Sequence, residues 1–256
     1  MSQKKITILG LSDIGKRRDS NQDRIFYKRD KFKNKNIVLC FVADGLGGLK
    51  NGEVASGLVL SSFENWWKNK VSACLEEYDN IDFVANSIKE VIETINTNIF
   101  YYSLSGNMKC GTTLSLLFLY DNEYCVFNIG DSRIYKKESN QLLCITNDDT
   151  YVNEQFKLGK LTEEEVKNHP KRNVLTKCLG QKESVIVKFD FYDLTDEKGF
   201  LIFSDGFYRS LKDNEINMLF NKGLFSNYES KFKNLLESVL SRDGSDNTSG
   251  ILIAID

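Results

Sequence analysis

The sequence predicts an α+β fold in which helices cover an antiparallel β-sheet or sandwich. Three observations lead to this class: short runs rich in Ile, Val, Phe and Tyr, two long segments with helical periodicity, and very short links between neighbouring runs. Tight links join antiparallel strands, because a parallel pair needs a crossover of about a dozen residues or more. Hairpins combined with long helices predict packed layers with the helices outside.

The expected strands are short apolar runs that end at turn-forming residues. Residues 113–120 and 124–129 are separated by a very short connection, and so are 124–129 and 132–137, which predicts two antiparallel hairpins. The remaining expected strands are 6–11, 37–43, 185–191, 200–203 and 250–255.

Two long helices are expected from apolar residues that recur every three or four positions. In the segment 53–68 one such side contains Ala55, Val59, Phe63 and Trp66, and core packing is the expected role of at least one residue of the Trp66-Trp67 pair. The segment 81–102 carries the longer stripe, and shorter helices are expected at 213–220 and 228–240. The residues of the longer stripe are Val84, Ile88, Val91, Ile92, Ile95 and Ile99.

Composition excludes several functions. The 256 residues include 34 Lys and Arg against 36 Asp and Glu, a formal net charge of -2, so the clustered basic surplus of a nucleic-acid-binding protein is missing. The single His, His169, cannot build a His-rich zinc site. The six cysteines form no CxxC pair and none is followed six residues later by Arg, so we expect small buried apolar side chains and no thiolate phosphoryl chemistry.

The domain organisation is expected to be simple. The chain has one proline, Pro170, and no Gly/Ser-rich linker, so residues 1–256 are predicted to form a single domain. No apolar run approaches the roughly 20 residues that span a bilayer, and the N-terminus lacks the apolar core of a signal peptide. A cytoplasmic monomer with no membrane or nucleic-acid partner is the resulting expectation.

Four aspartates lie at or beside the ends of expected core strands. These are Asp44, Asp131, Asp205 and Asp246, and the first three adjoin glycine, which permits close backbone approach to a ligand. Each Asp-Gly or Gly-Asp pair alone is a common turn. Four carboxylates gathered at one edge, however, would need cations to neutralise them. Oxygen ligands without His or Cys favour Mg²⁺ or Mn²⁺ over Zn²⁺.

The N-terminal segment 10–23 allows two interpretations of its basic and glycine residues. Residues 10–16 fit GxxxxGK, but Arg17 stands where a phosphate-binding loop needs Ser or Thr, and no helical pattern follows, which disfavours a nucleotide hydrolase. Alternatively, Arg18 lies five residues before Asp23, and a guanidinium beside a metal cluster is suited to phosphate capture. A solvated basic loop is the simpler interpretation if the segment is considered alone.

Seven ordered motifs closely resemble the metal-dependent Ser/Thr protein phosphatases of type 2C, the PPM family, in its compact bacterial form. The likeness spans nearly the whole chain, and a single DG or GD pair would carry little weight without the order. The motifs are GxxRxxNxD (15–23), VADGLGG (42–48), GEVAS (52–56), GTT (111–113), GDSRIY (130–135), SDG (204–206) and SDNTS (245–249).

The resemblance implies a four-layer α-β-β-α sandwich, with a central antiparallel β-sandwich flanked by helix pairs and a Mn²⁺ or Mg²⁺ site at one end. Two metals per chain are implied, with a third, weaker site in addition. Residues 150–173 would form a flap beside the site. The implied roles are a bridge between the metals for Asp44, metal ligation for the Gly45 carbonyl, Asp205 and Asp246, ligation through water for Asp23, a third metal for Asp131, and phosphate binding for Arg18.

The implied reaction is hydrolysis of phosphoserine and phosphothreonine in proteins by a metal-bridging hydroxide, without a phosphoenzyme intermediate. The partners would be phosphorylated proteins, expected to be the substrates of a Ser/Thr kinase. Leu46 stands where some eukaryotic members have His, and Gln22 where Glu is frequent. Two alternatives are a phosphatase dedicated to one partner in a signalling switch and a regulatory module with weak catalysis, the latter disfavoured by Asp44, Asp205 and Asp246.

Overall fold

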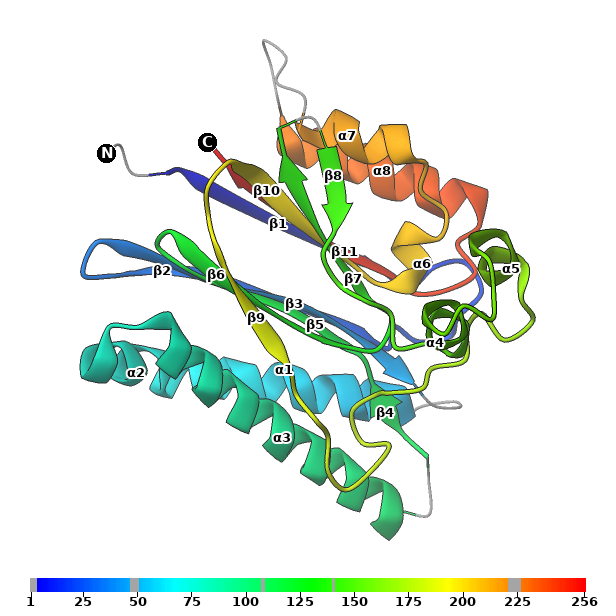
Figure 1. Ribbon diagram of the computed structural model, residues 1–256, viewed down its shortest axis with the longest axis horizontal. Helices are drawn as coiled ribbons and strands as arrows, with labels where there is room; N and C mark the ends of the chain where they lie inside the picture. Colours follow the sequence, from blue (N-terminus) through cyan, green and yellow to red (C-terminus); the bar gives the residue numbers. More distant parts are fainter. Residues whose placement is uncertain (1–3, 47–50, 107–108, 140, 221–226) are drawn as a thin grey trace.

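The computed structural model describes residues 4–46, 51–106, 109–139, 141–220 and 227–256. Two antiparallel sheets lie face to face, and helices cover the outer face of each (Figure 1). The expected layer order of helices, sheet, sheet and helices is therefore confirmed. Described side chains of both sheets, Val42, Leu117, Ile202 and Ile253 among them, form the buried cluster between the sheets.

The first sheet has the strand order β1-β11-β10-β7-β8. Its strands are β1 (Ile6–Asp13), β7 (Arg133–Glu138), β8 (Gln141–Cys144), β10 (Glu197–Phe203) and β11 (Thr248–Ile255). The second sheet has the order β2-β3-β5-β6-β9, and the short strand β4 also pairs with β3. Its strands are β2 (Asp23–Phe32), β3 (Lys35–Leu46), β4 (Gly111–Thr112), β5 (Leu114–Tyr120), β6 (Glu123–Ile129) and β9 (Phe189–Asp193).

Helices pack on the outer faces through apolar stripes. The second sheet is covered by α1 (Asn51–Asn69), α2 (Val71–Tyr78) and α3 (Ile81–Ser105), as Figure 1 shows. The first sheet is covered by α7 (Asp213–Phe220) and α8 (Tyr228–Arg242). These helices confirm the four that the sequence predicts. Trp66 is 2% exposed, and its indole N–H donates to the Ser87 hydroxyl at 2.9 Å, so its expected core role is confirmed.

The structure adds elements that the sequence pattern conceals. Strand β2 was not predicted, because its charged residues interrupt the alternation of apolar and polar positions that is typical of a strand. It tolerates these charges because it lies at the edge of its sheet and much of its length is solvated. Strand β9 begins at Phe189, four residues after the expected start, and is likewise an edge strand. The expected hairpin of 124–129 with 132–137 is wrong, because β6 pairs within the second sheet and β7 within the first, so the short link between them crosses from sheet to sheet. The cysteines are free, with Cys40, Cys110 and Cys125 buried, but Cys144 is exposed and departs from the expectation. In the described part of the chain no helix has the length and apolarity needed to cross a bilayer.

Candidate active site

The sheet topology brings the predicted aspartates to one end of the sandwich. Asp23 begins β2 and is the cross-strand partner of Asp44 near the end of β3. Asp205 follows β10 and Asp246 precedes β11, and since these two strands are antiparallel neighbours, both residues lie at the same end. Asp131 precedes β7, whose first residue pairs with the last residue of β10. Segments from five parts of the chain therefore meet at this end.

Backbone contacts hold Asp44 and Gly45 in place. The Asp44 N–H donates to the Thr113 hydroxyl at 3.0 Å, and the Asp44 carbonyl accepts from the Thr112 hydroxyl at 2.9 Å. Gly45 lies against the start of α1 so closely that a Cβ there would collide with the Gly52 carbonyl. The two glycines thus let the backbone of β3 pass directly beside α1. The two threonines of the GTT motif therefore have a structural role, which is to position the backbone of Asp44.

The amide of Asn247 fixes the loop that carries Arg18 and Asp23. Its Nδ2 donates to the carbonyls of Ile14 at 2.8 Å and Ser20 at 3.1 Å, and its Oδ1 accepts from the Gln22 N–H at 2.8 Å. Asn247 immediately follows Asp246 and is 5% exposed. We had not singled out this residue, although its place in the SDNTS motif was a signal for it.

Burial and mutual repulsion raise the pKa values of the carboxylates at this end of the sandwich. Burial raises the pKa of Asp23 to about 7, Asp205 and Asp246 add to the shift, and nearby Ser249 and Ser204 hydroxyls oppose it. The pKa of Asp44 lies well above its ordinary range, first because of burial and then because of the surrounding aspartates, Asp23 foremost. Such mutual influence shows that these side chains share one electrostatic environment.

Several buried oxygens at this end lack a hydrogen-bond partner among the described residues. They are both carboxylate oxygens of Asp23 and Oδ1 of Asp205. Unpaired buried carboxylate oxygens are costly, and hard divalent cations such as Mg²⁺ and Mn²⁺ prefer such ligands. The donor set therefore fits such ions. Within the described ranges, no three His, Cys, Asp or Glu side chains stand in an arrangement that would hold a metal by themselves.

Arg18 lies beside the carboxylates, as the N-terminal motif predicts. Its Nη2 is 2.7 Å from Asp246 Oδ2, and half of the Arg18 side chain is exposed. The hydrogen bond to Asp246 raises the Arg18 pKa further, and Asp44 and Asp205 act in the same direction. The structure thus brings the expected phosphate-binding cation to the expected metal ligands, with a solvent-exposed side from which a substrate can approach.

Arg209 is a second cation at this end that the sequence pattern did not reveal. Its Nη2 is 2.8 Å from Asp205 Oδ2 and 3.2 Å from Asp131 Oδ2. Burial and Asp205 raise the pKa of Asp131 to about 7, and Arg209 opposes this shift. The i,i+4 spacing from Asp205 to Arg209 was the available signal, but only if the four residues that follow Asp205 are taken to be helical.

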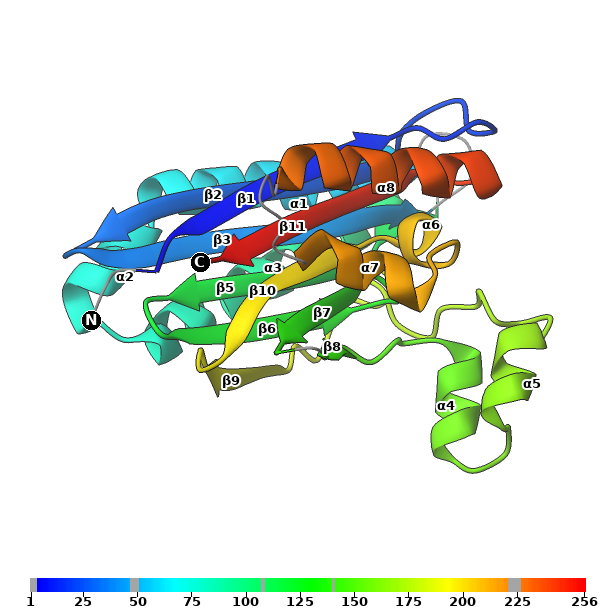
Figure 2. The same cartoon turned by 90° about the horizontal axis from the view of Figure 1, so that it is seen from above.

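The predicted flap contains two short helices, α4 (Tyr151–Lys157) and α5 (Glu163–Asn168), which project at the end of the molecule that α6 (Asp205–Tyr208) occupies (Figure 2). Its base is held by Arg133 of the GDSR motif, whose Nε and Nη2 donate to the two oxygens of Asp148 at 3.0 and 2.8 Å. The guanidinium also lies over the Tyr208 ring, 4.0 Å from its centroid. His169 is only partly exposed, with its ring 5.7 Å from that of Tyr151.

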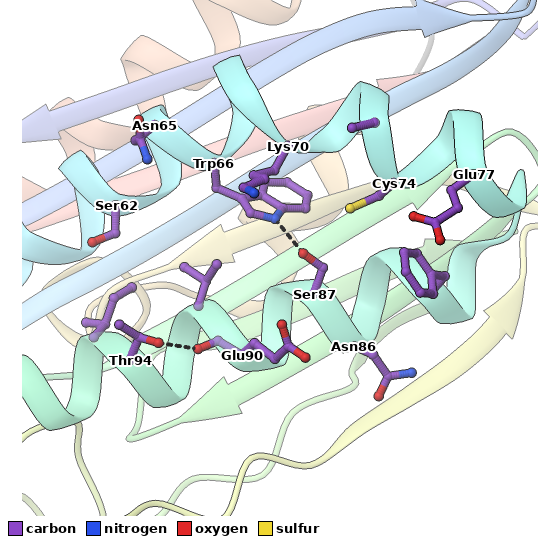
Figure 3. A pocket seen from close by; sticks show the side chains of 14 residues that line it. Ser62, Asn65, Trp66, Lys70, Cys74, Glu77, Asn86, Ser87, Glu90 and Thr94 are labelled. Carbon is purple, nitrogen blue, oxygen red and sulfur yellow. Dashed lines mark hydrogen bonds between the residues drawn. The ribbon is translucent and has the colours of Figure 1, made fainter.

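Two cavities flank the second sheet, and neither is lined by the site aspartates. One of about 580 Å³ lies between α1, α2 and α3, where Trp66 and Ser87 meet (Figure 3). The other, of about 690 Å³, is lined by Leu46 together with residues of α3 and the segment around Gly180. Leu46 follows Asp44 by two residues and is the link between this cavity and the strand that carries Asp44.

Comparison with known proteins defines the class. The family model described as protein phosphatase 2C matches residues 15–248. The chain therefore belongs to the protein phosphatase 2C family and is a protein phosphatase, which confirms the resemblance carried by the seven motifs.

The relatives are bacterial enzymes of similar length. Protein phosphatase PhpP of Streptococcus pneumoniae is 28% identical over 247 residues, 96% of each chain. A putative protein phosphatase 2C-type of Streptococcus pyogenes is 29% identical over 244 residues, 94% of each chain. The crystal structure of serine/threonine phosphatase Stp1 from Staphylococcus aureus superposes with a TM-score of 0.87 at 29% identity, covering 98% of this chain and 96% of that one.

Proposed function

We propose that this protein hydrolyses phosphoserine and phosphothreonine in proteins by a divalent-metal mechanism without a phosphoenzyme intermediate. The observation that carries the proposal is the group of buried carboxylate oxygens at one end of the sandwich, of which three lack a hydrogen-bond partner within the described residues. Family membership and the names of the relatives support the protein substrate. Burial raises the pKa of the Cys40, Cys125 and Cys178 thiols, which disfavours these three as thiolate nucleophiles.

The residues that would hold two Mn²⁺ or Mg²⁺ ions are those at the strand ends. Asp44 would contact both ions, Asp205, Asp246 and the Gly45 carbonyl would complete the set, and Asp23 would act through a water. Bound ions would supply Lewis acidity and lower the pKa of a water. The positions of Asp44 and Gly45 are supported by the threonine contacts and by the close passage of β3 beside α1.

Arg18 would bind the substrate phosphate. Its side chain contacts only Asp246 among the described ion pairs and is half exposed, so it has a short path to an incoming anion. A guanidinium can donate two parallel hydrogen bonds to phosphate oxygens, which orients the phosphoryl group as well as attracting it. Ligation of Asp246 by a metal would weaken its pairing with Arg18 and release the guanidinium for the substrate.

The wider organisation is proposed on similar grounds. The cluster of core residues shared by both sheets supports a single catalytic domain over 1–256. The Arg133–Asp148 pair supports a flap whose base is tied to the catalytic end. The monomeric state, the cytoplasmic location and the partner kinase stay predictions from the sequence.

The proposed reaction is tested with p-nitrophenyl phosphate and a phosphothreonine peptide, each assayed with Mn²⁺, with Mg²⁺ and with EDTA. We expect activity with either metal and none after chelation, restored by adding metal back. Asp205→Asn is expected to abolish most of this activity, because it removes charge from a metal ligand. Activity that persists in EDTA, or an unchanged Asp205→Asn variant, would refute the metal mechanism.

Arg18→Ala is expected to raise KM for the phosphopeptide by about 10-fold or more, with a smaller loss of kcat. The reason is that a charge-assisted hydrogen bond lost at a binding site typically costs about 1.5–3 kcal/mol. Steady-state kinetics of Arg18→Ala beside Arg17→Ala, the exposed neighbour, provides the measurement and its control. A KM that stays at the wild-type value in Arg18→Ala would show that Arg18 does not bind the phosphate.

A further inference from the structure

A single nitrogen of Arg209 lies between two buried carboxylates at the catalytic end. Nη2 is within ion-pair distance of both Asp205 Oδ2 and Asp131 Oδ2, at 2.8 and 3.2 Å. The Asp131 side chain is 6% exposed and that of Asp205 is 13% exposed. Two carboxylates with so little water around them need a positive charge between them, and the guanidinium supplies it.

The local fold places Arg209 there. Asp205 opens the single-turn helix α6, and the Arg209 N–H donates to the Asp205 carbonyl at 3.1 Å, so the two side chains project from the same face one turn apart. Gly206 lets this turn lie against the entry to β11, because a Cβ at Gly206 would collide with the Asn247 carbonyl. The backbone around Arg209 is thus held by the same segment that carries Asp246.

The two oxygens of Asp205 have different surroundings. Oδ2 is paired with Arg209, whereas Oδ1 is buried and has no hydrogen-bond partner in the described part of the chain. Asp44 is a near neighbour of this carboxylate, because each of the two side chains influences the pKa of the other. Arg209 therefore pairs with one oxygen of Asp205 and leaves the other, buried oxygen available to an ion.

Arg18 and Arg209 differ in a way that separates their roles. Arg18 contacts one carboxylate and is half exposed, whereas Arg209 contacts two carboxylates and is about one-third exposed. Loss of its Asp246 contact would leave Arg18 in solvent at little cost. Displacement of Arg209 would remove the counter-charge that Asp131 has in the folded protein, and breaking a buried pair in this way is strongly destabilising.

We propose that Arg209 is the permanent counter-cation of Asp131 and Asp205, so that this chain binds two divalent ions and has no third metal site at Asp131. The inference rests on the proposed two-metal function and deepens it. It replaces the expectation, drawn from the family resemblance, that Asp131 binds a third, weaker ion. Arg209 is then a positioning residue that holds Oδ2 of Asp205 and leaves Oδ1 for a metal ion.

The test counts Mn²⁺ ions per chain, without substrate, by titration with electron paramagnetic resonance of free Mn²⁺ and by calorimetry. The variants are Arg209→Asn, Arg209→Lys and Asp131→Asn. Arg242→Asn is the matched control, because Arg242 also pairs with a carboxylate, that of Glu215, but contacts none of the site aspartates. Circular dichroism checks that each variant is folded.

Wild type, Arg209→Lys, Asp131→Asn and Arg242→Asn are each expected to bind two ions at saturation. Arg209→Asn is expected to bind one additional, weaker ion, since it exposes the Asp131–Asp205 pair. Its two tighter sites should weaken by roughly 10–100-fold, the usual result when a residue that orients a metal ligand is lost. Addition of Asp131→Asn to Arg209→Asn should remove the additional ion.

Three results would overturn the inference and leave the proposed function standing: a third ion in wild type, loss of an ion in Asp131→Asn, or no additional ion in Arg209→Asn. The Asp131→Asn measurement decides the matter even if Arg209→Asn does not fold, because Asp131 is a metal ligand under the opposing view. Binding of no Mn²⁺ by wild type would instead refute the two-metal function itself.

Discussion

Asp44→Asn is expected to lower kcat/KM by on the order of 10³-fold or more, beyond the 10–100-fold typical of losing a residue that only orients a ligand. The substitution keeps the shape of the side chain and the backbone hydrogen bonds to Thr112 and Thr113, so the fold is preserved. It removes the one charge expected to contact both ions. Activity toward the phosphopeptide at saturating Mn²⁺ is the measurement.

The same substitution is expected to stabilise the metal-free protein. The Asp44 carboxylate is repelled by Asp23, Asp205, Asp131 and Asp246, and its pKa is raised by burial above all. A neutral amide removes the cost of ionising a buried group at neutral pH. Thermal unfolding in EDTA should therefore give a higher Tm for Asp44→Asn than for wild type, while its activity is lost.

Asp190→Asn is the matched control, since Asp190 is an exposed residue of β9. It should leave both kcat/KM and Tm close to the wild-type values. Asp44→Asn with near-wild-type activity would contradict the bridging role. An Asp44→Asn variant with a lower Tm in EDTA would contradict the electrostatic account of the site.

Mn²⁺ is expected to raise Tm by roughly 10 °C at pH 8, because an ion at 1,000 times its Kd contributes about 4 kcal/mol and a chain of this size gains about 2–4 °C per kcal/mol. In EDTA, Tm is expected to fall between pH 5 and pH 8. Thermal unfolding at several pH values, with Mn²⁺ and with EDTA, measures both effects.

The sign of the pH effect follows from the raised pKa values. Asp23 and Asp131 have folded-state pKa values of about 7, and Asp44 and Asp205 are also raised, whereas an unfolded Asp titrates near 3.9. Between these limits the folded state binds more protons than the unfolded state, so stability decreases as pH rises through this window. Bound cations neutralise the carboxylates and should flatten the dependence.

The range from pH 5 to pH 8 suits this measurement of Tm because few other groups of the protein titrate there. His is the side chain that ordinarily titrates between pH 5 and 8, and the chain contains only His169, outside the carboxylate group. Asp44→Asn should show a smaller fall of Tm in EDTA and a smaller gain from Mn²⁺. A Tm in EDTA that is constant or rises from pH 5 to 8 would exclude this electrostatic coupling.

Local signals predicted much of the fold and the site. Apolar periodicity located the two long helices, α1 and α3, and a short link located the hairpin β5–β6. The second expected hairpin, 124–129 with 132–137, was wrong, because β6 and β7 belong to different sheets and their short link crosses from one sheet to the other. Asp44, Asp205 and Asp246 were found because each lies at or beside the end of an expected core strand, where side chains of several strands can meet. Two edge strands were not predicted. Strand β2 carries many charged residues on its solvated length and loses the alternation on which prediction depends, and β8 has only four residues.

Contacts between segments far apart in the sequence could not be predicted from local sequence patterns. Asn247 was missed because its importance lies in three hydrogen bonds to the segment 14–22, more than 220 residues away. The flap helices α4 and α5 are short and amphipathic only in part, and α5 has no buried residue at all. Such elements are held by contacts at their ends, like the Arg133–Asp148 pair, and not by an apolar stripe.

The sequence by itself indicated the family through seven ordered motifs. It also indicated the layered fold and the candidate aspartates, because strand periodicity and turn chemistry are local properties of the chain. Only the tertiary structure decided which charges face one another. It paired Arg18 with Asp246 and placed Arg209 between Asp131 and Asp205, since antiparallel strands of two sheets end at the same edge there. Burial at that edge then determines which carboxylates need a cation, and that is a property of the packed molecule alone.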